Sequence, residues 1–341
     1  MRKLISNTIV ALAIVLTLAS CSNNKATSSF TFAFYNVENL FDTIDDPNIS
    51  DEKYLPESKI PWNSERFDHK LDNLSRVMKG IDTTGFPALF GLCEVENIDV
   101  LEALINHTSL QKAGYNIIHK DSPDGRGIDV ALLYNPKIYS PIKAVYIKPV
   151  FTDNPGLKTR DILYSKGVIN NLDTLHVFIN HWVSRWGGQE KTEPNRIQIA
   201  KTIKRITDSI LNLHPNANIL IAGDLNDNPT DLSISEALQA KEVVSKPSNK
   251  TLYNLSLTQF KNGEGSLYYK SWDMFDQIIV STAMLTGING LKVNSQQQSV
   301  YTQDWMLYQP KEGPARPSRT AAGRYYGGFS DHLPVYIGIT N

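Results

Sequence analysis

The sequence of 341 residues predicts an α/β fold whose β-sheets are mixed or antiparallel. Short apolar or alternating segments predict the strands, and apolar residues spaced three and four apart predict amphipathic helices. Polar residues that follow some strands and precede others predict the strand directions. These side chains can meet at one edge of a sheet only if strands of opposite direction share that sheet.

The predicted strands are distributed along the chain beyond residue 30, without an internal repeat of fixed period. They are residues 31–36, 88–93, 128–134, 142–148, 162–169, 175–180, 218–223, 275–281 and 334–339. No linker long enough to separate two domains interrupts the series. We therefore expect one domain over residues 30–341, and we expect it to be a monomer.

Three segments show the apolar spacing of amphipathic helices. Their apolar faces comprise Phe67, Leu71, Leu74, Val77 and Met78; Val100, Leu101, Leu104 and Ile105; and Ile199, Ile203, Ile206 and Ile210. The longest helix is expected over 194–213, with Pro194 in its first turn, where a missing N–H is tolerated. Residues 42–65 and 294–328 are rich in Pro, Gly, Ser, Asn and charge, and they predict long loops.

The first twenty residues predict an export signal. Arg2 and Lys3 precede an apolar run over 9–19, which is shorter than the about 20 residues that span a membrane. The run ends in Leu-Ala-Ser-Cys at 18–21, which resembles a bacterial lipobox. We expect a lipoprotein signal peptide over 1–20, lipid on Cys21, a flexible tether over 21–29, and anchoring in the periplasm or at the outer membrane. The alternative is an ordinary secretory signal.

Composition leaves the binding partner undecided. The chain is 41% hydrophobic and 20% charged with a formal net charge of −1, so no strong field of either sign selects or excludes nucleic acid. Cys93 is the only cysteine after Cys21, which excludes an internal disulfide in the exported domain. Its apolar neighbours in ALFGLCEV favour a buried side chain over a nucleophile.

Polar side chains stand where the predicted strands leave or enter the core. Those that follow a strand are Asn36, Glu38, Glu94, His181, Asp224 and Asn226, and those that precede one are Asp276, Asp331 and His332. Carboxylate and amide oxygens without cysteine suit a hard cation such as Mg²⁺ or Mn²⁺, and the two histidines stay free to titrate. Phosphoester hydrolysis needs charge for the phosphoryl oxygens, a group that aims water, and a donor to the leaving oxygen. This set supplies all three.

Six motifs carry a resemblance to a known family. YNVEN, LCEVEN, INHW, AGDLND, FDQIIVS and SDHLPV, in this order, resemble the endonuclease/exonuclease/phosphatase superfamily, which includes pancreatic-type deoxyribonuclease, abasic-site endonucleases, neutral sphingomyelinases and inositol polyphosphate 5-phosphatases. The resemblance covers about residues 30–340 and implies a four-layer α/β sandwich, with two mixed β-sheets packed face to face and helices outside. The segment WVSRWGGQEKTEPNR after His181 resembles a bacterial lipoprotein branch.

The resemblance implies metal-binding and phosphate-binding roles for the matching positions. Glu94 would be the principal ligand of Mg²⁺, with Asn36 and Glu38 beside it and Asp331 near the metal. The phosphate-binding arginines would be Arg160, Arg185 and Arg319, with Arg196 a further candidate, and Arg160 in TRDIL matches a family position. Scattered arginines do not form the continuous basic stripe that duplex DNA would favour.

The resemblance also implies the catalytic roles. Asp224 would orient or deprotonate the attacking water, and Asn226 would hydrogen-bond the phosphate. His181 and His332 would bind the charged phosphoryl group, one of them as an acid, and Asp276 would pair with a histidine. The base stays open between Asp224 and a histidine.

Two other interpretations of these motifs fail. AGDLNDNP begins like an EF-hand loop at Asp224, but that loop needs Gly and Glu where Pro229 and Ser235 stand. GFSDH is similar to a nucleophile elbow, but that motif needs Gly where His332 stands.

The sequence leaves three functions open. The leading hypothesis is a lipid-anchored, Mg²⁺-dependent phosphodiesterase that cleaves nucleic acid like an endonuclease. The second keeps the chemistry but makes the protein a phosphatase or a phospholipid or sphingomyelin-type phosphodiesterase. The third is a non-catalytic, lipid-anchored binding protein. The true substrate, endo or exo preference and the membrane leaflet stay open.

Overall fold

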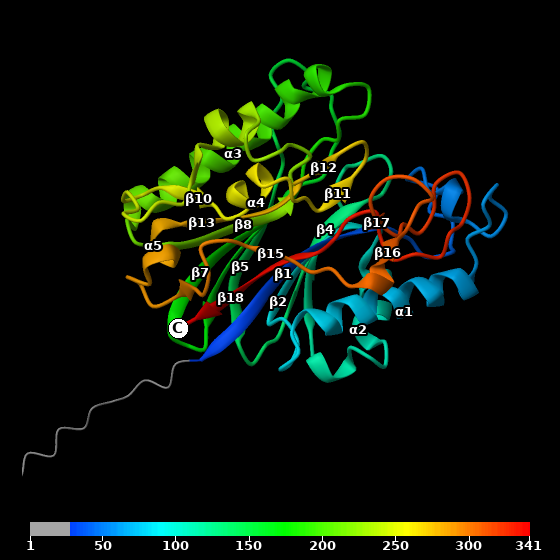
Figure 1. Ribbon diagram of the computed structural model, residues 1–341, viewed down its shortest axis with the longest axis horizontal. Helices are drawn as coiled ribbons and strands as arrows, with labels where there is room; N and C mark the ends of the chain where they lie inside the picture. The colour runs from blue at the N-terminus through cyan, green and yellow to red at the C-terminus, as the bar shows by residue number, and fades with distance from the viewer. Residues whose placement is uncertain (1–27) are drawn as a thin grey trace, which may run out of the picture.

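The computed structural model describes residues 28–341, in which two large β-sheets pack face to face (Figure 1). The first sheet has the order β14-β18-β1-β2-β4-β3, with β15 paired to β18. Its strands are β1 (Ser29–Leu40), β2 (Leu89–Val95), β3 (Asn116–His119), β4 (Asp129–Tyr134), β14 (Lys292–Val293), β15 (Ser299–Val300) and β18 (Val335–Thr340).

The second sheet has the order β5-β6-β7-β8-β13-β10-β9. Its strands are β5 (Tyr139–Ile147), β6 (Ile162–Ile169), β7 (Asp173–His181), β8 (Asn218–Asp224), β9 (Ala240–Glu242), β10 (Leu252–Asn254) and β13 (Asp276–Ser281). Two hairpins lie outside the large sheets: β11 (Leu267–Tyr268) with β12 (Trp272–Asp273), and β16 (Leu307–Tyr308) with β17 (Arg316–Pro317).

Both large sheets are mixed, which confirms the prediction from the strand directions. β1 runs parallel to β2 and antiparallel to β18, while β7 runs parallel to β8, which is antiparallel to β13. In register, Asp224 faces His181 on one side and Asp276 on the other. The last residues of some strands and the first residues of others therefore share one edge.

Helices cover the outer faces of both sheets. α1 (Ser64–Ile81) and α2 (Ile98–Asn106) pack on the first sheet, and α3 (Gln189–Leu213) packs on the second (Figure 1). Apolar side chains form three buried clusters: one between the sheets, one under α1 and α2, and one under α3. This layering confirms the predicted α/β sandwich.

Shorter helices occur in the connections. They are the α-helices α4 (Leu257–Lys261) and α5 (Thr282–Thr286), the 3₁₀-helices η1 (Glu52–Tyr54), η2 (Gln111–Ala113) and η4 (Asp304–Met306), and the π-helix η3 (Ser233–Leu238). The predicted loops over 42–65 and 294–328 contain only such short pieces before α1 and before β18. No helix of the described residues is long and apolar enough to cross a membrane.

The third predicted helix begins earlier than expected. α3 starts at Gln189, so Pro194 lies inside the helix rather than in its first turn. Side chains strengthen this first stretch, because the Thr192 hydroxyl donates to Gly188 O (2.9 Å) and the Arg196 guanidinium donates to Gln189 O (3.4 Å).

The predicted signal peptide over 1–20 and the lipid-bearing Cys21 lie outside the described residues. Of the tether predicted over 21–29, only Ser28 and Ser29 are described, and Ser29 already begins β1. The folded domain thus begins one residue before the predicted boundary at residue 30.

Candidate active site

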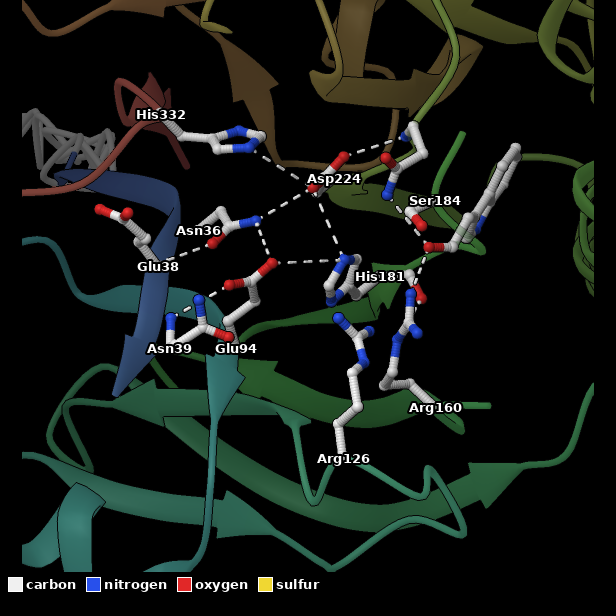
Figure 2. A network of polar contacts seen from close by, with 12 residues as sticks. Asn36, Glu38, Asn39, Glu94, Arg126, Arg160, His181, Ser184, Asp224 and His332 are labelled. Carbon is white, nitrogen blue, oxygen red and sulfur yellow. Dashed lines mark hydrogen bonds and ion pairs between the residues drawn. The ribbon is translucent and has the colours of Figure 1, made fainter. Parts of the chain in front are cut away.

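Polar side chains gather at the shared edge of the two sheets (Figure 2). Five of them form what we call the strand-end cluster: Asn36, Glu94, His181, Asp224 and His332. They come from β1, β2, β7 and β8 and from the residues just before β18. All except Glu94 are buried.

The Asn36 amide connects the two carboxylates of the cluster. Its Nδ2 donates to Glu94 Oε1 (3.2 Å) and to Asp224 Oδ2 (3.0 Å), while its Oδ1 accepts from Glu38 N (3.0 Å). Because the amide is fully buried, both carboxylates are held at a fixed separation.

Glu94 occupies an irregular position where β2 shifts its register against β4. Its φ of +62° is uncommon for a residue with a side chain and stores about 1 kcal/mol of strain. The carboxylate accepts from Asn39 N (3.0 Å) through Oε2, and its side chain is 16% exposed against 3% for Asp224. A partly exposed carboxylate beside an amide fits a hydrated Mg²⁺, which usually takes one or two carboxylates and keeps its waters.

His181 lies close to the carboxylates of Asp224 and Glu94, but it does not form an ion pair with them near pH 7. His181 Nε2 lies 3.6 Å from Asp224 Oδ2 and 3.8 Å from Glu94 Oε1. Burial, with the positive charges of Arg160 and Arg126, holds the pKa of His181 well below its ordinary value, so this imidazole is neutral near pH 7. Burial raises the pKa of Asp224 to about 6, which leaves an ionised carboxylate with affinity for a proton near neutral pH.

His332 carries the opposite charge state from His181. Its Nδ1 lies 2.7 Å from Asp276 Oδ2, and its Nε2 lies 3.8 Å from Asp224 Oδ2. Burial alone would lower the pKa of His332, but the carboxylates of Asp276 and Asp224 raise it well above its ordinary value. One neutral and one protonated imidazole therefore lie on the two sides of Asp224.

Asn226 forms hydrogen bonds to Asp224 and to Trp182. Its backbone N–H donates to Asp224 Oδ1 (3.0 Å), and its side-chain Nδ2 donates to Trp182 O (3.1 Å). A φ of +50° at Asn226 makes this turn possible. The residue fixes the orientation of the Asp224 carboxylate.

Glu38 and Asp331, which the sequence analysis places near the metal, belong to another set of contacts. The Glu38 carboxylate accepts from Thr320 N (2.5 Å) and Arg319 Nε (3.2 Å), and Arg319 Nη2 lies 2.6 Å from Asp331 Oδ2. Both carboxylates therefore have protein partners in the Arg319–Thr320 segment, and their predicted place near the metal stays a prediction.

Two of the arginines predicted to bind phosphate form hydrogen bonds and ion pairs with other residues of the protein. Arg160 is buried, pairs with Asp124 (2.9 Å), and donates to the carbonyl oxygens of His181 and Trp182. Arg185 donates to Asn226 O (2.8 Å) and pairs with acidic residues beyond β8. Both therefore hold the loops that follow β7 and β8, and their phosphate-binding role stays a prediction. Arg196 is likewise fully buried, paired with Asp227 (2.8 Å).

Two residues near the site were not predicted from the sequence. Arg126, in the loop before β4, extends toward Glu94 and His181 in Figure 2, and its side chain is 52% exposed. Lys70 on α1 is buried and donates to Phe329 O (2.7 Å) and to the Thr320 hydroxyl. Lys70 lies on the same buried face of α1 as Leu71 and Leu74, so the helical spacing of apolar residues could have predicted its burial. Arg126 lies in a polar loop, where no such periodicity exists.

A separate group of ionisable side chains lies at the ends of β3 and β4. Suitable ligand atoms of His119, Asp121 and Asp129 all lie within 4.8 Å of one another, and His119 Nε2 is 3.2 Å from Asp129 Oδ2. This acidic cluster shares no residue with the strand-end cluster. A metal-binding measurement must therefore separate the two places.

The sequence matches the Endonuclease/Exonuclease/phosphatase family over residues 31–341. Members of this superfamily are hydrolytic phosphoesterases and generally depend on a divalent metal. The sequence matches no curated protein.

Solved structures share the fold at low sequence identity. The human Nocturnin catalytic domain with bound sulfate is 14% identical (TM-score 0.56, covering 91% of this chain and 94% of that one). A mannosyl-6-phosphatase of Bacteroides thetaiotaomicron is 16% identical (TM-score 0.54, covering 91% and 99%). TDP2 of D. rerio, humanized by 14 mutations, is 13% identical (TM-score 0.54, covering 92% and 98%). Identities this low establish the fold alone.

Proposed function

We propose, since the chain belongs to the endonuclease/exonuclease/phosphatase family, that it is a metal-dependent phosphodiester hydrolase of the endonuclease type acting on nucleic acid. The observation that carries this proposal is the Asn36 amide. It holds the carboxylates of Glu94 and Asp224 together, between one neutral and one protonated histidine.

Glu94, with Asn36 beside it, would hold a Mg²⁺ or Mn²⁺ ion, and the bound ion would supply positive charge to the phosphoryl oxygens. The protein's own side chains have the remaining tasks. Asp224 orients the attacking water and takes its proton, since its pKa lies near 6. Protonated His332 binds the phosphoryl oxygens and can give a proton to the leaving oxygen, while Asp276 keeps it charged.

The proposal is tested with a small diester, bis(p-nitrophenyl) phosphate, and with plasmid and single-stranded DNA. We expect hydrolysis that requires Mg²⁺ or Mn²⁺, stops with EDTA, and is absent in Glu94→Gln. A His119→Ala variant is the matched control, because it alters the separate acidic cluster and leaves Glu94 in place. Hydrolysis that survives both EDTA and Glu94→Gln would show that the strand-end cluster is not a metal-dependent centre.

We also propose that the protein is an exported lipoprotein, anchored through Cys21 in the periplasm or at the outer membrane, and that it acts as a monomer. The support is the basic start, short apolar run and Leu-Ala-Ser-Cys ending of the first 21 residues. In a bacterial host, the wild-type protein should sediment with membranes and Cys21→Ser should not. Equal sedimentation of both would contradict lipid anchoring.

A further inference from the structure

A cavity of about 600 Å³ opens beside the strand-end cluster. Its lining comes from the β11–β12 hairpin, the β16–β17 hairpin and the loop that leads to β18. Asp331 lines the cavity and is the chain neighbour of His332, and Leu267 at the start of β11 forms a bridge with His332. The lining of the cavity thus reaches the residue next to His332, which is the part of the strand-end cluster nearest to it in the chain.

Tyrosine rings dominate the apolar part of the lining. Tyr269, Tyr308 and Tyr326 line the cavity and are 76%, 52% and 49% exposed, and Tyr268 adds a fourth ring. Large rings at this exposure gain little from burial in the core and present aromatic surface to the solvent. Their position around one cavity indicates a surface for flat or ring-shaped groups.

Two arginines give the same cavity a positive charge. The guanidinium carbon of Arg316 lies 5.5 Å from the centre of the Tyr308 ring, and that of Arg324 lies 4.7 Å from the centre of the Tyr326 ring. Among residues 28–341, no carboxylate lies within 4.0 Å of either guanidinium, whereas Arg319 is paired with Glu38 and Asp331. Arg316 and Arg324 are thus available to anions.

We propose that this cavity is a subsite for unstacked nucleotides that flank the scissile phosphodiester of a single-stranded nucleic acid. The inference rests on the proposed function and names its substrate class. Aromatic faces that stack bases, beside arginines that contact phosphates, are the combination that binds single strands. A duplex keeps its bases stacked on each other and offers no free faces to these tyrosines. A lipid chain would instead need a continuous apolar wall.

The test measures binding without catalysis. The full chain in EDTA is titrated into a fluorescently labelled oligo-dT, and anisotropy gives Kd. We expect Tyr308→Ala and Tyr269→Ala each to raise Kd about 10-fold, within the range for loss of one stacked base, and Tyr308→Phe to keep the wild-type Kd. Arg316→Gln should reduce the slope of log K against log salt by about 0.7, the value for one phosphate contact on a single strand.

The specificity of hydrolysis gives an independent readout. In Tyr308→Ala, the ratio of kcat/KM for the oligonucleotide to kcat/KM for bis(p-nitrophenyl) phosphate should fall about 10-fold. An unchanged Kd in both alanine variants would overturn the subsite, as would duplex DNA binding more tightly than the single strand. A loss of affinity for mannose 6-phosphate or for phospholipid vesicles alone would also overturn it. Tyrosine-dependent oligonucleotide binding without hydrolysis of either substrate would support the subsite and contradict the proposed function.

Discussion

The strand-end cluster and the C-terminal loop region, which we define as residues 304–331, adjoin at His332 but are built differently. The cluster stands on strands of the two large sheets, and most of its side chains are buried with polar partners. The loop region contains only η4, β16 and β17 as regular elements and presents exposed rings such as Tyr308 and Tyr326. Under the function and subsite that we propose, the sheets would fix the chemistry and the loop region would select the substrate.

Two buried ionisable side chains join these regions. Glu38 belongs to β1, and its N–H donates to Asn36, but its carboxylate accepts from Thr320 N. Lys70 on α1 donates to Phe329 O in the same loop region. Burial and the nearby Asp331 raise the pKa of Glu38 to about 7, and burial lowers that of Lys70 to about 8, so both are held away from their ordinary values.

The largest expected effect is on the strand-end cluster. Asp224→Asn should lower kcat for bis(p-nitrophenyl) phosphate about 10³-fold, because the group that takes the proton from water is lost. Steady-state kinetics measures this, and an unchanged melting temperature serves as the control for folding. The division between the two regions would break down if Tyr308→Ala lowered kcat for the same small diester as strongly.

The second effect concerns the charge of His332. Asp276→Asn removes the carboxylate that most raises the pKa of His332, so the imidazole should lose its proton at lower pH. Activity should fall about 10²-fold at pH 8 and less at pH 6. The measurement is the pH profile of kcat. A uniform loss at all pH values would indicate that Asp276 has only a structural role.

The third prediction concerns the stability of the C-terminal loop region relative to that of the two sheets. Lys70→Met leaves Phe329 O without its buried donor, which should destabilise the loop region by about 2 kcal/mol. Hydrogen exchange should become faster over 318–330 and stay unchanged in β1 and β8. The matched variant Lys79→Met, at an exposed position in the last turn of α1, should alter neither. Equal acceleration in the sheets would mean that the two regions unfold together.

The smallest effect comes from a histidine outside both regions. Burial lowers the pKa of His176 on β7 to about 4, and its Nδ1 lies 2.8 Å from the Tyr164 hydroxyl. The unfolded chain binds this proton near pH 6.5, so His176 contributes stability above that pH that is lost as pH falls toward 4. His176→Gln should remove about 2 kcal/mol of this acid sensitivity, measured by urea unfolding at pH 4.5 and 7. If the free energy of unfolding of His176→Gln changed between pH 7 and 4.5 as much as that of the wild type, other groups, including the strand-end cluster, would cause the acid sensitivity.

The fold and most of the strand-end cluster could be predicted because alternation locates strand ends, and Asn36, Glu94, His181 and Asp224 stand at such ends. The role of Glu38 could not be predicted in this way. It lies near the end of β1 as Asn36 does, but its partner Thr320 is 282 residues away. The contact uses the backbone N–H of Thr320, which leaves no signature in the sequence. The protein partners of Arg160 and Arg185 could not be predicted for a related reason, because an arginine donates to carbonyl oxygens as readily as to phosphates.

The chain enters the sandwich at the edge opposite the strand-end cluster. Asn341 N donates to Ser28 O (3.1 Å) at the beginning of β1, and the last residues and the start of this strand lie together at the lower left of Figure 1. Asn36 lies eight residues further along, about 25 Å at 3.3 Å per residue. A lipid ahead of Ser28 would therefore be attached at the edge of the domain that lies opposite the site. An enzyme held in this way would collect passing polymers or small esters, while the headgroups of its own bilayer would lie behind it.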